Sequence, residues 1–340
     1  MPTSITRQLA LLAIAAFSVT TAHAPPDAAL DVYARPGTMV RIGDHRRLDL
    51  RCSGSGAPTV LLEAGALADS MSWSRLQPLV ARSTRVCAYD RAGLGFSDEG
   101  PAPRDLAADV DDLHALVRAA HLATPLVLVG HSRGSNIVRR YAERCPGDVA
   151  GLVLVDPPPQ DIAAFSPEWA KADDEQRTAG LAFYEACGKG AERGLLEAPP
   201  EELKACLRGP DPRYSAALNT ALHRIKSRPA FWRTVIAVTV SNQALFSQPV
   251  PADERHGDLP LVVLTADAAY ADAQPADRAV LERAQEATHA RIAATSTRSR
   301  RVHVPGASHD IQQDHPEAVA AAIEDVVAQS RHPLAPARSH

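Results

Sequence analysis

Short apolar runs of strand length recur along the chain, separated by stretches in which apolar residues return every three or four positions. Most of these runs are continuous rather than alternating, which is typical of parallel strands that helices cover on both faces. The predicted strands are residues 59–63, 85–89, 126–129, 152–155, 261–265 and 301–304. Strand and helix patterns alternate, so the sequence predicts an α/β fold with a mostly parallel, doubly wound sheet.

Helical patterns occupy residues 105–120, 135–144 and 316–329, between or after the predicted strands. Ahead of the first parallel strand, residues 39–42 and 46–52 flank a Gly-Asp turn. Two short strands around such a turn are typical of an antiparallel hairpin. We therefore expect the sheet to begin with a hairpin at one edge.

The alternation is interrupted once, by residues 157–258. This segment opens with Pro157-Pro158-Pro159 and carries helical stretches and further prolines. A structureless loop of that length is improbable in a compact domain. We expect a mostly helical cap at 157–258, inserted between strands 6 and 7 and lying over the active site. The core would then comprise residues 25–156 and 259–330.

The N-terminal residues have the pattern of a signal peptide. Arg7 supplies a positive charge, residues 9–19 are apolar, and Ala22-His23-Ala24 fits the small-residue cleavage rule. The apolar run is short for a bilayer span, although an uncleaved anchor is the alternative. We expect residues 1–24 to be removed, Pro25 to begin the mature chain, and the protein to be periplasmic or secreted.

Composition narrows the classes of function. The chain has 340 residues and 45% hydrophobic content, enough for one large core with an insertion. The formal net charge is −4 and charges of both signs are interspersed, so we expect no nucleic-acid partner. The sequence has no HExxH and no dense His/Asp cluster, and its glycine-rich stretch at 89–97 lacks a following Lys-Ser/Thr. We therefore expect no metal and no cofactor.

The strongest chemical signal is an apolar strand that leads into Gly130-His131-Ser132-Arg133-Gly134 and then into a helix. The two glycines of a G-x-S-x-G motif relieve crowding in a sharp turn, and the serine projects from the end of the strand. The motif alone is weak, but the strand before it and the helix after it make it specific. Ser132 is the predicted nucleophile; the alternative is a structural serine in a turn.

A serine hydroxyl is a poor nucleophile at neutral pH and needs a general base. Of 13 histidines, His309 lies in a loop directly after the last predicted strand and before the last helix. That position is at the carboxyl edge of the sheet, where Ser132 also lies. His303 is close in sequence but falls inside the strand. His309 is therefore the predicted base.

An oxyanion hole needs two donors. We expect one from the backbone N–H of Arg133, directly after the nucleophile, and one from the N–H of Ala66 in the loop at 62–67. Gly65 allows that loop to turn tightly. For the side chain of Arg133 two orientations stay open, into the pocket or into solvent.

Five blocks now make a resemblance apparent: residues 58–65, 86–98, 129–134, 151–156 and 306–309, in this order within 38–328. The chain resembles the α/β-hydrolase superfamily and, within it, bacterial hydrolases with a Leu-Glu-Ala-Gly oxyanion loop in place of the commoner His-Gly. Two departures from the pattern exist. Ser135 replaces the usual second glycine after the nucleophile, and Ala307-Ser308 stands where Ser-Gly is usual.

The resemblance leaves the acid of the catalytic triad open. It places this acid after the seventh strand, where the expected position holds Ala269, flanked by Asp267 and Asp272. The other location is the end of the sixth strand, where Asp156 follows directly. We favour Asp156, with Asp267 and then Asp272 as the alternatives.

The five cysteines include no CxxC pair, and an odd number leaves at least one unpaired within the chain. The resemblance places the second strand beside the fourth, which predicts a Cys52–Cys87 disulfide. We expect Cys187 and Cys206 to join two parts of the cap and Cys145 to stay free. Five reduced cysteines are the alternative.

The predicted function is hydrolysis of a small-molecule ester or related acyl substrate through an acyl-enzyme, as in carboxylesterases and lipases. One alternative is an aminopeptidase of the prolyl-aminopeptidase-like type, which needs a carboxylate in the cap to hold the substrate amine. The candidates are Glu175, Glu185, Glu201 and Glu202. Another is a catalytically silent binding protein on the same fold. Haloalkane dehalogenases and epoxide hydrolases are disfavoured because these resembling groups use Asp where this chain has Ser132. Substrate identity and oligomeric state do not follow from the sequence.

Overall fold

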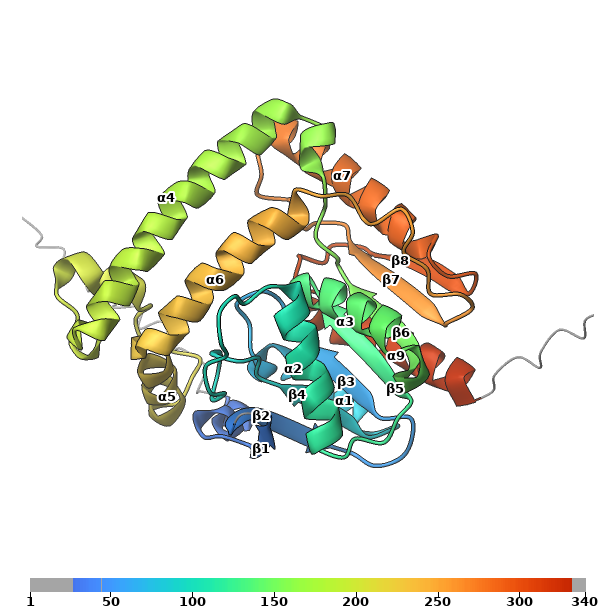
Figure 1. Cartoon of the computed structure of the whole chain (residues 1–340), viewed down its shortest axis with the longest axis horizontal. Helices are drawn as coiled ribbons and strands as arrows, with labels where there is room; N and C mark the ends of the chain where they lie inside the picture. The colour runs from blue at the N-terminus through green and yellow to red at the C-terminus, as the bar shows by residue number, and fades with distance from the viewer. Residues whose placement is uncertain (1–26, 44, 332–340) are drawn as a thin grey trace, which may run out of the picture.

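A computed structural model of the chain describes residues 27–43 and 45–331 (Figure 1). Within these residues one sheet has the strand order β1-β2-β4-β3-β5-β6-β7-β8. The strands are β1 (Thr38–Ile42), β2 (Arg46–Ser53), β3 (Val60–Glu63), β4 (Val86–Tyr89), β5 (Leu126–His131), β6 (Val149–Val155), β7 (Leu261–Ala266) and β8 (Ser299–Val304). The β1–β2 and β2–β4 pairs are antiparallel, and the remaining pairs are parallel. The predicted hairpin and α/β-hydrolase fold are both confirmed.

Helices cover both faces of the sheet, which explains why its central strands are continuous apolar runs. Every residue of β3, β4, β5 and β7 is buried. On one face the core contains residues of α2 (Leu106–Ala119) and α3 (Arg133–Arg144). On the other it contains residues of α1 (Gln77–Val80) and α9 (Pro316–Arg331). The parallel strands therefore end together at one edge, and the connections after them carry the polar side chains described below.

One long helix of the core, α7 (Pro275–Ala293), is missing from the sequence prediction. Its buried face is made largely of small or polar residues: Leu281, Ala284, Gln285, Thr288, His289 and Ile292. Because few of these are large and apolar, the helix leaves no clear hydrophobic stripe in the sequence.

Between β6 and β7 the chain forms the segment 157–258, which we call the cap segment. It contains α4 (Pro167–Glu192), α5 (Ala216–Ser227) and α6 (Pro229–Phe246), with short 3-10 turns between them. In Figure 1, α4 and α6 run side by side away from the sheet, and the two helices pack on each other. The expected helical content of this segment agrees with the structure.

Two disulfides are present, and both match the predicted pairing. Cys52 and Cys87 face each other in the register of β2 and β4 and are joined. Cys187 of α4 is joined to Cys206, 19 positions later. Cys145 is free and half-buried.

Removal of the cap disulfide by a Cys187→Ser, Cys206→Ser double substitution is expected to destabilise this segment. On the chain-entropy model a loop of this size contributes about 3 kcal/mol. Both sulfurs lie in a small buried cluster with Leu196 and Trp232, so their loss also exposes this cluster. Urea unfolding followed by circular dichroism should show a lower midpoint for the double variant and an unchanged one for Cys145→Ser. Equal midpoints for all three proteins would contradict a stabilising bridge.

Within the described ranges no helix is long and apolar enough to cross a membrane. The expected signal peptide, residues 1–24, lies outside the described residues.

Candidate active site

The turn between β5 and α3 has the geometry that the G-x-S-x-G motif predicts. Ser132 adopts φ 51° and ψ −124°, a strained conformation for a residue other than glycine. A Cβ atom on Gly130 would lie 2.5 Å from the carbonyl oxygen of Gly134, and one on Gly134 would lie 2.4 Å from that of Glu63. Both positions therefore require glycine. The N–H of Ser132 donates to the carbonyl oxygen of Val155 at 3.0 Å, which fixes the serine beside the end of β6.

The first departure from the family pattern adds a contact rather than a clash. Ser135 is fully buried, and its hydroxyl donates to the carbonyl oxygen of Ser132 at 2.6 Å. In the loop after β8, Gly306 adopts φ +72°, and Ala307, part of the second departure, is fully buried.

Asp156, which directly follows β6, contacts His309. Its Oδ2 lies 2.6 Å from Nδ1 of His309. Its Oδ1 accepts hydrogen bonds from the backbone N–H of Ala266 at 3.0 Å and from Nε2 of Gln285 at 2.8 Å. The carboxylate is almost completely buried, and these donors compensate the loss of water. Both carboxylate oxygens therefore have hydrogen-bond partners, and Oδ2 orients the imidazole of His309.

The two alternative acids lie elsewhere. Asp267 pairs with His303 through an Oδ1–Nδ1 contact of 2.8 Å, and both side chains are exposed. Asp272 is exposed on the loop after β7. Of the three candidates, Asp156 is the one that the structure brings to His309.

Two opposing effects set the pKa of His309. Burial lowers this pKa, but the hydrogen bond to Asp156 and the charge of that carboxylate raise it more, so the pKa lies above the ordinary histidine value. Because Nδ1–H donates to Asp156, the neutral ring carries its free lone pair on Nε2. Such a ring can accept a proton from a nucleophile.

This shift predicts the acid limb of the pH profile. Protonated His309 cannot act as a base, so kcat/KM should rise with pH as His309 loses its proton. The pKa is raised, which places the midpoint above the ordinary histidine value of about 6.5. Measurement of kcat/KM across the pH range checks this, because this ratio reports the groups that titrate in the free enzyme. A flat profile from about pH 5 to 9 would remove a histidine base from the mechanism.

The ring of His131 links the nucleophile turn to the loop of His309. Its Nε2 lies 3.0 Å from the carbonyl oxygen of His309, and the two rings are 4.8 Å apart between centroids. Burial and the nearby His309 lower the pKa of His131 to about 3, so the ring is neutral and donates from Nε2. In the described part of the chain no hydrogen bond joins Ser132 Oγ to His309. Hydrogen bonds of catalytic groups commonly tighten only when substrate binds.

The predicted oxyanion loop is held from behind by Arg91, a buried residue that the sequence reasoning did not single out. Its guanidinium donates to the carbonyl oxygens of Ala64 at 2.6 Å, of Gly65, and of Ala66 at 2.7 Å. It also forms a 2.6 Å ion pair with Glu63. The carbonyl groups therefore point toward Arg91, and the loop is fixed by one side chain.

The two expected oxyanion donors have no acceptor of their own. Within the described residues, neither the backbone N–H of Ala66 nor that of Arg133 donates to another group of the protein. Arg133 is buried, and an unpaired N–H group inside a protein is rare unless a ligand or water completes it, whereas Ala66 is half-buried. The arrangement suits a developing negative charge.

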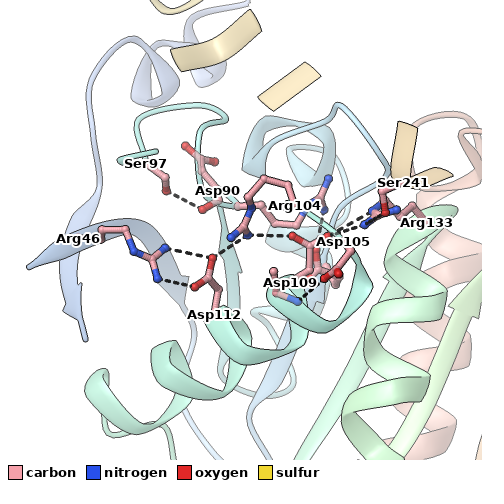
Figure 2. A network of polar contacts seen from close by, with 12 residues as sticks. Arg46, Asp90, Ser97, Arg104, Asp105, Asp109, Asp112, Arg133 and Ser241 are labelled. Atoms are coloured by element: carbon pink, nitrogen blue, oxygen red, sulfur yellow. Dashed lines mark hydrogen bonds and ion pairs between the residues drawn. The ribbon is translucent and has the colours of Figure 1, made fainter. Parts of the chain in front are cut away.

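The side chain of Arg133 takes neither of the two expected orientations. It is fully buried, so it points neither into an open pocket nor into solvent. Its guanidinium forms an ion pair with Asp109 of α2 at 2.8 Å and reaches α6 of the cap segment at Ser241 and Asn242 (Figure 2). The expectation failed because these partners lie far from Arg133 in sequence.

A cleft of about 1740 Å³ is lined both by the core and by the cap segment. From the core it includes Leu67, beside the oxyanion loop, and Asp310, beside His309; from the cap segment it includes Lys226 and Phe231. Ser132 and His309 do not themselves line it, but Leu67 and Asp310 are the direct neighbours of Ala66 and His309, so the cleft borders the loops of the site. The four cap glutamates considered above are exposed, and none of them lines this cleft.

Among the described residues no group of three His, Cys, Asp or Glu could hold a metal ion.

Known proteins that resemble this chain include a family of hydrolases and several individual relatives. The alpha/beta hydrolase family matches residues 59–322. The uncharacterized protein YqjL of Bacillus subtilis is 34% identical over 113 residues, which is 33% of this chain and 45% of that protein. A haloalkane dehalogenase of Sphingobium indicum is 30% identical over 148 residues, 42% of this chain and 48% of that protein. The chain therefore spans less than half the length of these two relatives.

Among solved structures, a thermophilic esterase from Thermogutta terrifontis aligns with a TM-score of 0.55 and 22% identity, over 87% of this chain and 99% of the esterase. A likeness at this level of identity shows a shared fold. Substrate and reaction have to be argued from the residues at the site.

Proposed function

Because the chain belongs to the alpha/beta hydrolase family, we propose that it is a serine hydrolase that cleaves an ester or a related acyl substrate. The observation that carries the proposal is the 2.6 Å contact between buried Asp156 and His309, at the sheet edge where the strained Ser132 turn lies. A nucleophile, a base and an acid that orients the base are the three groups that acyl transfer by serine requires.

The proposed reaction has two halves. Ser132 Oγ attacks the acyl carbon while its proton passes to Nε2 of His309, and the N–H groups of Ala66 and Arg133 stabilise the oxyanion. His309 then gives this proton to the leaving oxygen, and the alcohol departs. Water attacks the acyl-enzyme with His309 again as base, which releases the carboxylic acid and restores Ser132.

The nucleophile favours acyl transfer over the chemistry of the dehalogenase relative. Groups that use an aspartate nucleophile form an ester with the substrate carbon, whereas Ser132 offers a hydroxyl that needs the His309 base. The aminopeptidase alternative has no positive observation behind it, because the four cap glutamates are exposed on the surface of the cap segment.

A panel of p-nitrophenyl esters of graded acyl length, assayed beside aminoacyl anilides, tests the proposal. We expect turnover of at least one ester class and none of the anilides. Cleavage confined to the anilides would replace the esterase by an aminopeptidase. No turnover, together with no reaction of Ser132 with a fluorophosphonate, would favour a silent binding protein.

We also propose that the cap segment acts as a substrate-selecting domain over the core formed by 25–156 and 259–330. Its Lys226 and Phe231 contribute to the cleft, which supports this role. The two disulfides support export, since such bonds persist in oxidising compartments. N-terminal sequencing of exported protein tests the latter, with Pro25 as the expected first residue.

A further inference from the structure

Charged side chains of alternating sign form a continuous network that runs from β2 through α2 to the start of α3 (Figure 2). Arg46 pairs with Asp112 at 2.8 Å, and Arg104 contacts Asp112 at 2.7 Å and Asp109 at 3.0 Å. Arg133 closes the network on Asp109 at 2.8 Å. Arg104, Asp109, Asp112 and Arg133 are all buried. A buried charge destabilises the folded state unless an opposite charge pairs with it. Removal of one member of the network would therefore leave its neighbour as an unpaired buried charge.

Arg133 is the member of this network that reaches the cap segment. Its Nη1 donates to Oδ1 of Asn242 at 2.6 Å, and its Nη2 donates to the hydroxyl of Ser241 at 3.2 Å. Both acceptors lie on α6. The same residue follows the nucleophile in sequence, and its backbone N–H is one of the two proposed oxyanion donors. One residue therefore contacts the core helix α2 and the cap helix α6 and directly follows the nucleophile in sequence.

The other end of α6 is attached to the core by different contacts. Arg228, which precedes the helix, donates to the carbonyl oxygen of Gly95 at 2.6 Å. Arg233 forms an exposed ion pair with Glu99 at 2.7 Å. Neither contact involves the turn of Ser132. The Arg133 contact thus differs from these in that it joins the cap helix to the residue beside the nucleophile.

We propose that the side chain of Arg133 is a positioning device that couples the seating of the cap segment to the oxyanion hole. When α6 is seated on the core, Asn242 and Ser241 hold the guanidinium, and the fixed side chain holds the N–H of Arg133 toward the oxyanion. When α6 lifts, the guanidinium keeps Asp109 and loses its cap acceptors, and the start of α3 gains freedom. Acylation is then fastest with the cap seated. This inference rests on the proposed serine hydrolase function.

Asn242→Ala tests the coupling, because it removes a cap acceptor and leaves the buried Arg133–Asp109 ion pair intact. We expect its rate of reaction with a fluorophosphonate at Ser132 to fall about tenfold, since loss of a whole oxyanion donor costs about 10²- to 10³-fold. With an ester substrate, kcat should fall while KM changes little. Asn242→Asp should react close to the wild-type rate, because its carboxylate still accepts from the guanidinium.

The matched control is Arg233→Gln, which breaks the exposed cap–core ion pair at the other end of α6. It should react at the wild-type rate. The coupling is overturned if Asn242→Ala also reacts at that rate, or if Arg233→Gln is slowed as much as Asn242→Ala, since general loosening of the cap would then explain both. Absence of labelling in folded wild-type protein would instead overturn the proposed function, so the two failures are distinguishable.

Discussion

Replacement of Ser132 by alanine is expected to lower kcat for the best ester substrate by about 10⁶-fold. The substitution removes the atom that attacks the acyl carbon, and neither His309 nor the oxyanion donors can replace it. The fold should be preserved, because the contacts of Ser132 to β6 and Ser135 use its backbone. Initial rates of purified protein and a thermal unfolding curve measure the two effects separately.

A serine away from the site provides the control for this substitution. Ser83 lies on the surface near the amino end of β4, and its hydroxyl donates only to the carbonyl oxygen of Val80. Ser83→Ala should keep wild-type turnover. If Ser132→Ala also kept it, Ser132 would be a structural residue of the turn.

Asp156→Asn is expected to lower kcat by about 10⁴-fold. Ala266 N–H and Gln285 both donate to the Oδ1 side of the carboxylate, so the oxygen of the introduced amide must take that position. Its NH₂ group then faces Nδ1 of His309. The ring is forced to accept at Nδ1 and to carry its proton on Nε2, where it can no longer accept the proton of Ser132. Steady-state kinetics on the purified variant measure the loss.

Asp267→Asn and Asp272→Asn are the matched controls, because both acids lie on the loop where the family more often places this group. Both variants should retain near-normal turnover. Normal turnover in Asp156→Asn, with collapse in Asp267→Asn, would move the acid to the loop after β7. Asp156→Asn should also lower the midpoint of the pH profile, since the charge of Asp156 raises the pKa of His309.

The residues that the sequence identifies most directly are those whose local pattern carries their chemistry. Gly130 and Gly134 are needed because a side chain at either position would clash, and the serine between them is therefore visible in the sequence. His309 is visible because it lies in the loop between the last strand and the helices that follow it. The strands themselves are visible because helices bury both of their faces.

The features that escape the sequence depend on contacts between distant positions. Arg91 holds the oxyanion loop some 25 positions away, and Arg133 reaches Asn242 across 109 positions. The choice of Asp156 stays open in the sequence because it depends on the backbone after β6. That residue adopts φ 44°, and its carboxylate meets His309, 153 positions later. A pattern read along the chain contains none of these distances.

Mass spectrometry of protein treated with a fluorophosphonate shows whether Ser132 is the nucleophile. We expect one adduct per folded chain, located on Ser132 by peptide mapping and absent at low pH, where His309 is protonated and cannot act as a base. Folded protein that stays unmodified at neutral pH, or an adduct that maps to another residue and persists in Ser132→Ala, would contradict it.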